Sequence, residues 1–238
     1  MTVWLVARYW LYIGHRWLGI CACLLFAIWL LSGLVMSYVG YPEAQPARRY
    51  QSLQPLDWSQ VRVDPDGLLA YLGLPRYPRE LRLEMLLGEP VYRVIDWDGA
   101  RTTVSARSGE RVGAVEAEQA VAIAQAYANA RGSLQATVER DQWTVPQRFA
   151  TLRPLHRIAI DDAAATEVYV SARNGEVVLA TTRTQRFWNW FGAIPHWLYF
   201  SQLRQDARLW GQIIIWTSLL GTFLTAIGLY LGIGRFKR

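Results

Sequence analysis

The feature of this sequence that most constrains its fold is a run of twenty-five residues without a charged side chain. The run extends from Trp17 to Tyr41. At about 1.5 Å of rise per residue, a helix of this length exceeds the roughly 30 Å hydrocarbon core of a bilayer. A second charge-free run extends from Leu209 to Gly234. Because a backbone in lipid must satisfy its own hydrogen bonds, both runs are predicted to be transmembrane helices.

Charged residues are distributed unevenly along the 238-residue chain. All 19 acidic residues lie between Glu43 and Asp206, whereas five of the 25 basic residues lie outside this middle segment. Those five flank the two apolar runs: Arg8, Arg16, Arg235, Lys237 and Arg238. Basic residues mark the cytoplasmic flanks of membrane helices. We therefore expect a two-pass membrane protein with both termini cytoplasmic and residues 42–208 outside the cytoplasm.

The same distribution bears on two rival interpretations. A sequence pI near 9.5 is typical of nucleic-acid-binding proteins, but the basic excess here belongs to the helix flanks, so no nucleic-acid partner is expected. The first apolar run, Trp17–Tyr41, could be a cleaved signal peptide rather than a transmembrane helix. Its apolar core is longer than the usual core of about 7–15 residues, and no small-x-small cleavage site follows it, which favours a retained helix.

An internal repeat occupies the segment between the two runs. Tyr92–Val112 (YRVIDWDGARTTVSARSGERV) and His156–Val178 (HRIAIDDAAATEVYVSARNGEVV) each begin with a short aliphatic strand, turn at an acidic pair and return through an alternating strand. Both contain a Ser-Ala-Arg-[Ser/Asn]-Gly-Glu hexapeptide, at Ser105–Glu110 and at Ser171–Glu176. The period-2 alternation predicts half-buried antiparallel strands, and the Ser-Gly and Asn-Gly pairs predict tight turns.

A helix and a further strand are predicted ahead of each hairpin. Val115–Arg131 has helical apolar spacing, with Gly132 as its expected C-cap, and Pro65–Leu74 is the candidate helix of the first copy. Additional strands are expected at Glu80–Leu87 and Gln135–Val145. Each copy thus combines a helix with three or four antiparallel strands. The segment between the membrane helices is therefore predicted to be an α+β domain built from two tandem repeats.

The segment that leads back to the second apolar run is rich in aromatic residues. Seven Phe, Trp and Tyr side chains occur between Phe187 and Phe200. Aromatic and basic side chains concentrate in the headgroup zone, so this segment is expected to lie at the membrane interface with lipid as a partner.

Cys21 and Cys23 lie in the first run, two residues apart, and therefore point to different faces and cannot form a disulfide with each other.

These observations divide the chain into seven segments. The predicted order is an interfacial lead-in, a transmembrane helix, two repeats, an aromatic interfacial segment, a second transmembrane helix and a basic cytoplasmic tail, at residues 1–16, 17–41, 42–114, 115–182, 183–208, 209–234 and 235–238. Gly221 and Gly228 would let another helix approach the second membrane helix closely, so further membrane helices or subunits are expected partners.

The combination resembles a known family. The tandem repeat with its [Ser/Asn]-Gly-Glu turn is similar to two PepSY domains, and the flanks resemble the PepSY-associated transmembrane proteins, also called iron-regulated membrane proteins. The flanking matches are His15–Gly19, Ser32–Met36, Tyr41-Pro42 and the aromatic stretch around His196. Longer relatives continue into further membrane helices, including a second histidine-glycine helix start. This sequence stops at Arg238, as a short form, one half of a split system or a truncated product would.

The resemblance implies a protein of the bacterial inner membrane, with residues 42–208 in the periplasm, and a role in envelope electron transfer and iron uptake. Some similar proteins are di-haem reductases that move electrons across the inner membrane to ferric siderophores, so haem is the implied cofactor. Haem iron is usually held by histidine, and His15 and His196 are the candidate ligands. Roughly 30 Å separates them, so they cannot ligate one haem together and each needs a partner histidine from another helix or subunit. The competing interpretation, favoured without the further helices, is two interfacial histidines beside tryptophans.

A second class of function is compatible with the same resemblance. PepSY domains elsewhere accompany secreted proteases and are thought to inhibit or regulate them. The chain would then be a membrane-anchored, non-enzymatic module whose exposed sheet edge binds an envelope protein such as a protease. Whether the chain is an enzyme stays open between these two hypotheses.

Other candidate residues are expected to be structural. His156 has Tyr92 as its counterpart in the first copy, and a position that accepts tyrosine is interpreted as strand surface. Two acidic pairs occur at the hairpin turns, Asp96 with Asp98 and Asp161 with Asp162. Turn chemistry explains them better than a calcium site, which needs 6–8 oxygen ligands. The sequence contains no Ser-His-Asp or Cys-His constellation, phosphate loop or metal-ligand spacing, so no hydrolase, kinase or zinc enzyme is predicted.

Overall fold

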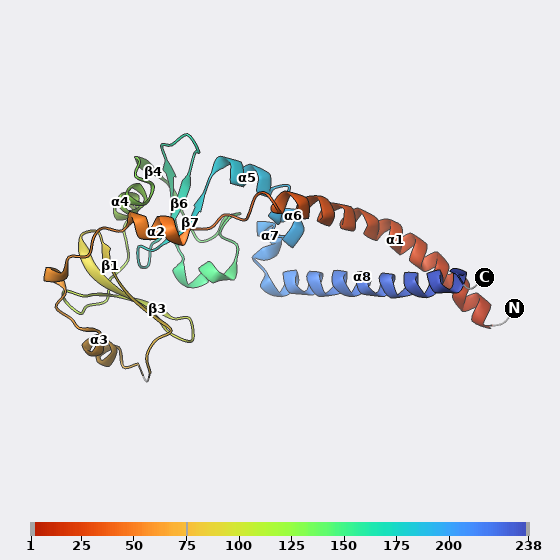
Figure 1. Cartoon of the computed structure of the whole chain (residues 1–238), viewed down its shortest axis with the longest axis horizontal. Helices are drawn as coiled ribbons and strands as arrows, with labels where there is room; N and C mark the ends of the chain where they lie inside the picture. Colours follow the sequence, from red (N-terminus) through yellow and green to blue (C-terminus); the bar gives the residue numbers. More distant parts are fainter. Residues whose placement is uncertain (1–2, 75, 237–238) are drawn as a thin grey trace. The chain divides into compact units, whose positions relative to one another are not determined.

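A computed structural model describes residues 3–74 and 76–236 of the chain. The chain divides into two compact units, a helical unit of residues 1–41 and 187–238 and a sheet unit of residues 42–186 (Figure 1). The structure confirms the predicted α+β class and the two long apolar helices, one near each end of the chain. The two units are described separately below.

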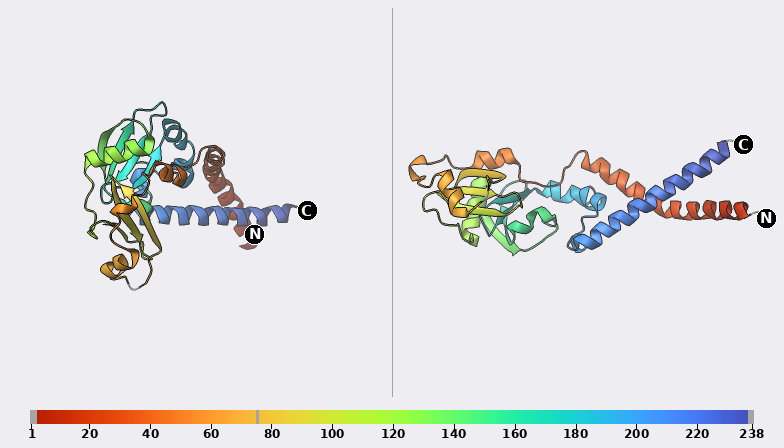
Figure 2. Two further views of the ribbon diagram at one scale, coloured as in Figure 1. Left: turned by 60° about the vertical axis from the view of Figure 1, so that its left-hand side comes forward. Right: turned by 90° about the horizontal axis from the view of Figure 1, so that it is seen from below.

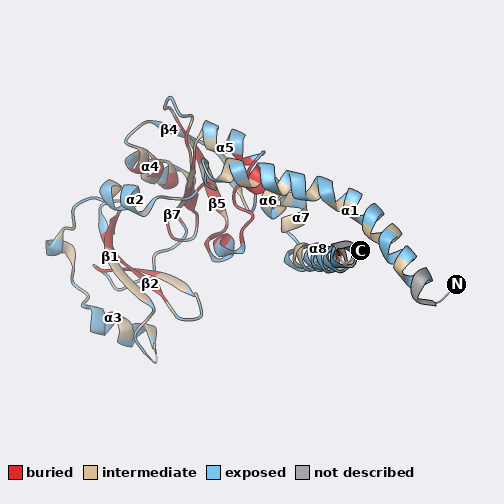
Figure 3. Ribbon diagram, turned by 45° about the vertical axis from the view of Figure 1, so that its right-hand side comes forward, coloured by how far each residue is buried: buried red, intermediate tan, exposed pale blue. Residues whose placement is uncertain are grey.

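Two long helices dominate the helical unit. α1 runs from Val3 to Met36 and α8 from Ala207 to Phe236. By length and composition each could cross a membrane, and most of their side chains are exposed within the single chain (Figure 3). The two helices contact each other, as the right-hand view of Figure 2 illustrates. Two short helices complete this unit, α6 (Ala193–Trp197), which contacts α1, and α7 (Ser201–Arg204), which contacts α8.

Helix α1 differs from the predicted helix at both ends. Residues 3–16, expected as an interfacial lead-in, are part of α1 because this segment contains no proline to break a helix. The helix ends at Met36 rather than at Tyr41. There the amides of Ser37 and Tyr38 bond to carbonyls three residues back, which tightens the last turn, and Pro42 follows. Of the predicted tail, residues 235 and 236 belong to α8, and residues 237–238 lie outside the described residues.

The sheet unit contains two antiparallel sheets with sequential strand order. The first sheet consists of β1 (Glu80–Leu86), β2 (Glu89–Ile95) and β3 (Arg101–Ser105). The second consists of β4 (Gly132–Val138), β5 (Leu155–Ile160), β6 (Glu167–Ser171) and β7 (Val177–Thr181). The connecting helices are α2 (Pro46–Ser52), η1 (Trp58–Gln60), α3 (Pro65–Leu72), α4 (Ala117–Ala128) and η2 (Gln147–Leu152), and α5 (Arg183–Asn189) follows β7.

Each sheet has its own hydrophobic core beneath one helix. Leu68 of α3 packs with Tyr92, Val94 and Val104 of the first sheet. In the second half, Ala120, Ala124 and Tyr127 of α4 pack with side chains of β5, β6 and β7, among them Ile158, Val168 and Val170. Figure 3 shows this burial concentrated along the strands and the inner face of α4. The predicted plan of one helix and one antiparallel sheet in each half is therefore confirmed.

Each half contains the same set of backbone hydrogen bonds, which we call the hydrogen-bond frame. The amide of Ala106 donates to the carbonyl of Pro90, and the amide of Ala172 donates to the carbonyl of Pro154. In the other direction, the carbonyls of Ala106 and Ala172 accept from Val63 and Val115, the residues before the N-caps of α3 and α4. The internal repeat is thus a repeat of three-dimensional structure as well as of sequence.

The turns of the repeat also match. Gly109 and Gly175 both adopt positive φ, at 79° and 70°, and both donate to the serine carbonyl that opens the hexapeptide. The acidic pairs serve the hairpin turns, as predicted. Asp96 and Asp98 accept backbone amides of their own turn, and Asp162 accepts the amide and the hydroxyl of Thr166.

Helix and strand ends show where local patterns were misleading. Asp64 caps α3 by accepting the amide of Gly67, as expected, and β1 lies where it was predicted. The C-cap of α4 is Asn129, with φ of 51°, and not Gly132. Gly132 instead begins β4, where a Cβ would lie 2.9 Å from Cδ1 of Ile160. The strand predicted at 135–145 therefore begins earlier and ends at Val138.

The interpretation of His156 as strand surface is wrong. Its ring is buried: Nε2 lies 2.9 Å from the carbonyl oxygen of Val115, and Nδ1 lies 2.8 Å from Oγ1 of Thr137. Since a carbonyl can only accept, Nε2 carries the proton and Nδ1 accepts from the threonine. Tyr92, the counterpart, is also buried, and its hydroxyl donates to the carbonyl of Val63 at 2.8 Å. Tyrosine and histidine thus occupy equivalent positions, and each contacts the carbonyl of the residue before the N-cap of its own helix.

Candidate functional site

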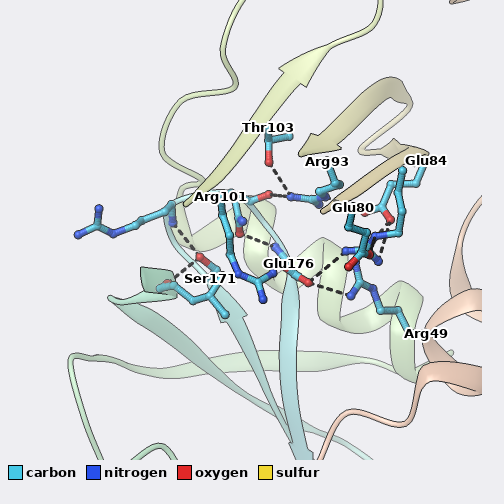
Figure 4. Close-up of polar contacts among 12 residues, drawn as sticks. Arg49, Glu80, Glu84, Arg93, Arg101, Thr103, Ser171 and Glu176 are labelled. Atoms are coloured by element: carbon cyan, nitrogen blue, oxygen red, sulfur yellow. Dashed lines mark hydrogen bonds and ion pairs between the residues drawn. The ribbon is translucent and has the colours of Figure 1, made fainter. Parts of the chain in front are cut away.

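A network of arginines and glutamates lies inside the sheet unit, where the two halves meet. We call it the arginine–glutamate cluster, and it consists of Arg49, Arg82, Arg93, Arg101, Glu80, Glu84 and Glu176. Figure 4 labels all of these residues except Arg82. Its members come from α2, from all three strands of the first sheet and from the turn before β7. The cluster therefore joins the two halves of the repeat.

Glu176 is the acceptor that three of these arginines share. Its Oε1 lies 2.8 Å from Nη1 of Arg49 and 3.5 Å from Nη2 of Arg82, and its Oε2 lies 3.0 Å from Nη1 of Arg101. The Glu176 side chain is only 8% exposed. Burial by itself would raise the pKa of this carboxyl, but Arg49, Arg101, Arg93 and Arg82 together outweigh burial and hold the pKa below its ordinary value.

Arg93 connects β2 of the first sheet to the turn between β6 and β7 through hydrogen bonds. Its Nε donates to Oε1 of Glu84 at 2.7 Å, and its Nη1 donates to Oγ1 of Thr103 at 3.1 Å and to the carbonyl of Asn174. Arg93 is 4% exposed, and burial lowers the pKa of its guanidinium while Glu84 opposes that shift. A buried charge of this kind is tolerated only when it is paired and hydrogen-bonded.

Two pockets adjoin the cluster. One has a volume of about 360 Å³ and is lined by Arg49, Arg82, Arg101 and Arg148 together with apolar side chains such as Phe149 and Leu152. The other has a volume of about 190 Å³ and lies between α2, the end of β1 and α4, with Arg49, Arg93, Glu84 and Glu176 among its lining residues. The cluster therefore borders cavities that solvent-sized or larger groups can enter.

A second buried polar network lies in the other sheet. The hydroxyl of Tyr169 donates to Oδ2 of Asp141 at 2.7 Å, and Nη1 of Arg157 lies 3.7 Å from the same oxygen. Burial, reinforced by Asp141, raises the pKa of Tyr169 far above its ordinary value. The phenol therefore stays a hydrogen-bond donor, and the network stabilises the second half of the sheet unit.

His196 lies inside the helical unit, against α1. Its Nδ1 is 3.2 Å from the carbonyl oxygen of Trp29 and 3.1 Å from Oγ of Ser32. A Cβ at Gly33 would lie 3.3 Å from Cε1 of His196, so the glycine lets the ring approach α1. In the tautomer in which Nδ1 donates to the Trp29 carbonyl, Nε2 keeps its lone pair for another partner.

His15 packs between the two long helices. A Cβ at Gly228 would lie 2.9 Å from Cε1 of His15, so α1 and α8 approach closely here because residue 228 is glycine. The buried Nδ1 of His15 has no hydrogen-bond partner among the described residues. His196 contacts Ser32, seventeen residues further along α1, so the two histidines are about 25 Å apart along the helix axis. They do not meet in one site.

Haem can be tested against these two rings. A histidine that ligates a metal through Nε2 usually donates its Nδ1 proton to a carbonyl, and His196 has this arrangement. His15 has a buried nitrogen that no described residue satisfies. His196 could therefore hold haem iron through Nε2, and His15 has one ring nitrogen without a partner; neither ring has a second histidine beside it within the described residues. His156, whose two nitrogens are both hydrogen-bonded, fits no ligand role.

Sequence reasoning missed the arginine–glutamate cluster. In the sequence, Glu176 is identified only as the last residue of the repeated hexapeptide, and no pattern singles out Arg49. The signal that could have drawn attention to the cluster is the repeat itself, since Arg93 and Arg157 are equivalent and each has a buried or half-buried acidic partner. Which glutamate meets which arginine depends on how the two halves pack, which no local pattern encodes.

The fold and these sites define an α+β protein with two tandem helix-on-sheet halves and two helices long and apolar enough to cross a membrane. No family model, curated protein or solved structure matches the chain. Its function is therefore argued from its own residues below.

Proposed function

We propose that this chain is a PepSY-type protein of the bacterial inner membrane and a haem-dependent component of envelope electron transfer, with ferric siderophores as the substrate class. Two helices that could span a membrane, together with basic residues flanking them, support the membrane location. In this arrangement both termini are cytoplasmic and the sheet unit lies in the periplasm.

The observation that carries this proposal is the orientation of His196. Its Nδ1 is fixed by the Trp29 carbonyl and the Ser32 hydroxyl, which leaves Nε2 available for iron. Haem, when bound, supplies one-electron chemistry. His196 and His15 would each hold one haem iron, near opposite ends of the helix pair. Gly33 and Gly228 make room for the two rings.

The second histidine for each haem would come from outside this chain. Because about 25 Å separates His15 from His196 along α1, one copy supplies only one ligand at each level. A second copy, or a subunit with equivalent helices, supplies the other. The protein is thus proposed to work as an assembly of membrane helices.

An absorption spectrum tests the proposal. The full chain, purified in a non-ionic detergent from haem-replete cells, should give reduced-minus-oxidised haem bands that disappear in His196→Ala and weaken in His15→Ala. His156→Gln is the matched control and should leave the bands unchanged, because His156 already has two partners in the sheet unit. A folded chain without haem bands would overturn the proposal.

A second function is favoured by a different observation, the exposed edge of the second sheet. β4 is an edge strand, and Ser133, Leu134 and Gln135 are exposed along it. An edge strand offers unpaired backbone groups that a partner strand can bind. If the spectrum shows no haem, we propose instead a membrane-anchored, non-enzymatic module that binds an envelope protein, such as a protease, at this edge.

A further inference from the structure

We infer that the 360 Å³ pocket beside the arginine–glutamate cluster binds a small oxyanion, a carboxylate or phosphate carried on a compact apolar body. This inference goes beyond the proposed function, since it concerns neither the histidines nor the β4 edge. It rests on the sheet unit alone.

Four arginines from four separate segments line this pocket. Arg49 belongs to α2, Arg82 to β1, Arg101 to β3 and Arg148 to η2. Guanidinium groups match carboxylate and phosphate oxygens in shape as well as in charge, because they present several N–H donors in a planar fork. Arginines that converge from different elements on one cavity therefore favour an oxyanion.

Three of the four arginines already bind a carboxylate, that of Glu176. One carboxylate takes Arg49 and Arg82 on one oxygen and Arg101 on the other, at 2.8, 3.5 and 3.0 Å. The three guanidiniums are thus already arranged around a carboxylate supplied by the protein. A ligand oxyanion that entered beside Glu176 would compete with this carboxylate for Arg49, Arg82 and Arg101, so its binding depends on the donors that Glu176 leaves open.

Donors remain open after the protein has used its own carboxylates. Arg101 pairs only through Nη1, so its Nε and Nη2 make no hydrogen bond within the described residues. Arg148 stacks on Phe149, 4.9 Å from the ring centroid, and forms no ion pair in the described part of the chain. These two side chains supply the free N–H groups of the pocket.

The charges and the apolar wall limit the ligand. The pocket is lined by four arginines and three glutamates, Glu43, Glu80 and Glu176. The net charge of its lining is therefore +1, which matches a ligand with a single negative charge. Ile95, Phe149, Leu152 and Val178 add apolar surface. Polar and apolar surface in one cavity of this size is typical of sites for small organic ligands, in which a few polar groups fix the orientation.

Calorimetric titration of the full chain tests the inference. The protein is held in a non-ionic detergent and a chloride buffer free of phosphate, sulfate and sulfonates. The probes are phenyl phosphate and benzoate, with benzyl alcohol as the uncharged analogue. Both oxyanions should bind and benzyl alcohol should not, and Arg148→Ala should weaken binding about tenfold or more because it removes a charge-assisted donor without touching Glu176.

Matched variants keep the test specific. Arg148→Lys should retain part of the affinity, since it keeps the charge and loses the planar fork. Arg131→Ala, which removes an arginine that is 90% exposed and does not line this pocket, should change nothing. The inference would be overturned if neither oxyanion bound at millimolar concentration, or if wild type and Arg148→Ala bound the oxyanions with equal affinity. Neither result bears on the haem spectrum, so the two proposals fail separately.

Discussion

Glu110 and Glu176 occupy the same position in the two tandem turns, yet only Glu176 is buried. The carbonyl of Glu110 accepts the amide of Ser105 at 2.8 Å, and that of Glu176 accepts the amide of Ser171 at 2.9 Å. The Glu110 carboxylate is exposed and reaches only the Ser108 hydroxyl, at 3.5 Å, within the described residues. The backbone is repeated, whereas the surroundings of the two side chains are not.

This pair provides a matched test of the arginine–glutamate cluster. Glu176→Ala should destabilise the sheet unit by about 1–3 kcal/mol, because Arg101, 25% exposed, loses its carboxylate partner, and Arg49 and Arg82, each 17% exposed, lose one of theirs. Glu110→Ala should cost less than about 0.5 kcal/mol, as exposed sites usually do. Hydrogen exchange measured by mass spectrometry should show faster exchange in β2, β3 and β7 for the first variant only. Equal protection in both variants would mean that the cluster does not hold the halves together.

The stability of the sheet unit should fall at acid pH. The folded-state pKa of Glu176 is held below its ordinary value of 4.5, so the carboxylate contributes stability above that pH and loses it as the pH drops through the lower, folded-state pKa. The thermal midpoint of the full chain in detergent should therefore decline below about pH 4.5.

Glu176→Gln provides the control for this pH dependence. The variant should be less stable at neutral pH and should show a flatter decline in acid, because its amide does not titrate in this range. Parallel pH profiles for wild type and Glu176→Gln would assign the acid sensitivity to other carboxylates.

Tyr92 offers a test of the repeated hydrogen-bond frame. Tyr92→Phe leaves the Val63 carbonyl without its donor and should cost about 1–3 kcal/mol. Tyr92→His should lose less, because the histidine at the equivalent position makes this bond in the second half. Tyr71→Phe, at a tyrosine that is 64% exposed, is the control and should be neutral. Urea unfolding followed by circular dichroism would compare the three, and a histidine as harmful as phenylalanine would contradict the equivalence.

Helix packing in the helical unit should depend on Gly228. A Cβ there would lie 2.9 Å from the ring of His15, so Gly228→Leu should separate α1 from α8 and cost about 1–3 kcal/mol. Gly232→Leu is the control, since a Cβ at that position meets nothing within 4 Å. Thermal unfolding in detergent should distinguish the two variants, and equal midpoints would show that His15 simply rotates away.

Local patterns in the sequence predicted much of the fold. The charge-free runs predicted α1 and α8, and the alternating hairpins predicted antiparallel sheets, because burial of one face imposes these periods on the chain. Boundaries were less secure. Gly132 was expected to cap α4 because glycine often caps helices, but the C-cap is Asn129. Gly132 lies in β4 instead, where the Ile160 side chain leaves no room for a Cβ.

The candidate sites were predicted less well, and His156 shows why. From one sequence, a position occupied by tyrosine in one copy and histidine in the other indicated a tolerant surface. The structure reveals a shared acceptor, the carbonyl before a helix, that both side chains can reach. Contacts of this kind join residues about 30–40 positions apart, and the partner of Glu176 in α2 is 127 positions away. Such pairings depend on tertiary packing.

The unequal environments of Glu110 and Glu176 have a consequence for stoichiometry. The hydrogen-bond frame occurs twice, but the arginines gather only around the second glutamate. A ligand that recognised the backbone of the repeat would saturate at two per chain. One that recognised these arginines would saturate at a single equivalent, so the duplicated architecture carries an unduplicated site.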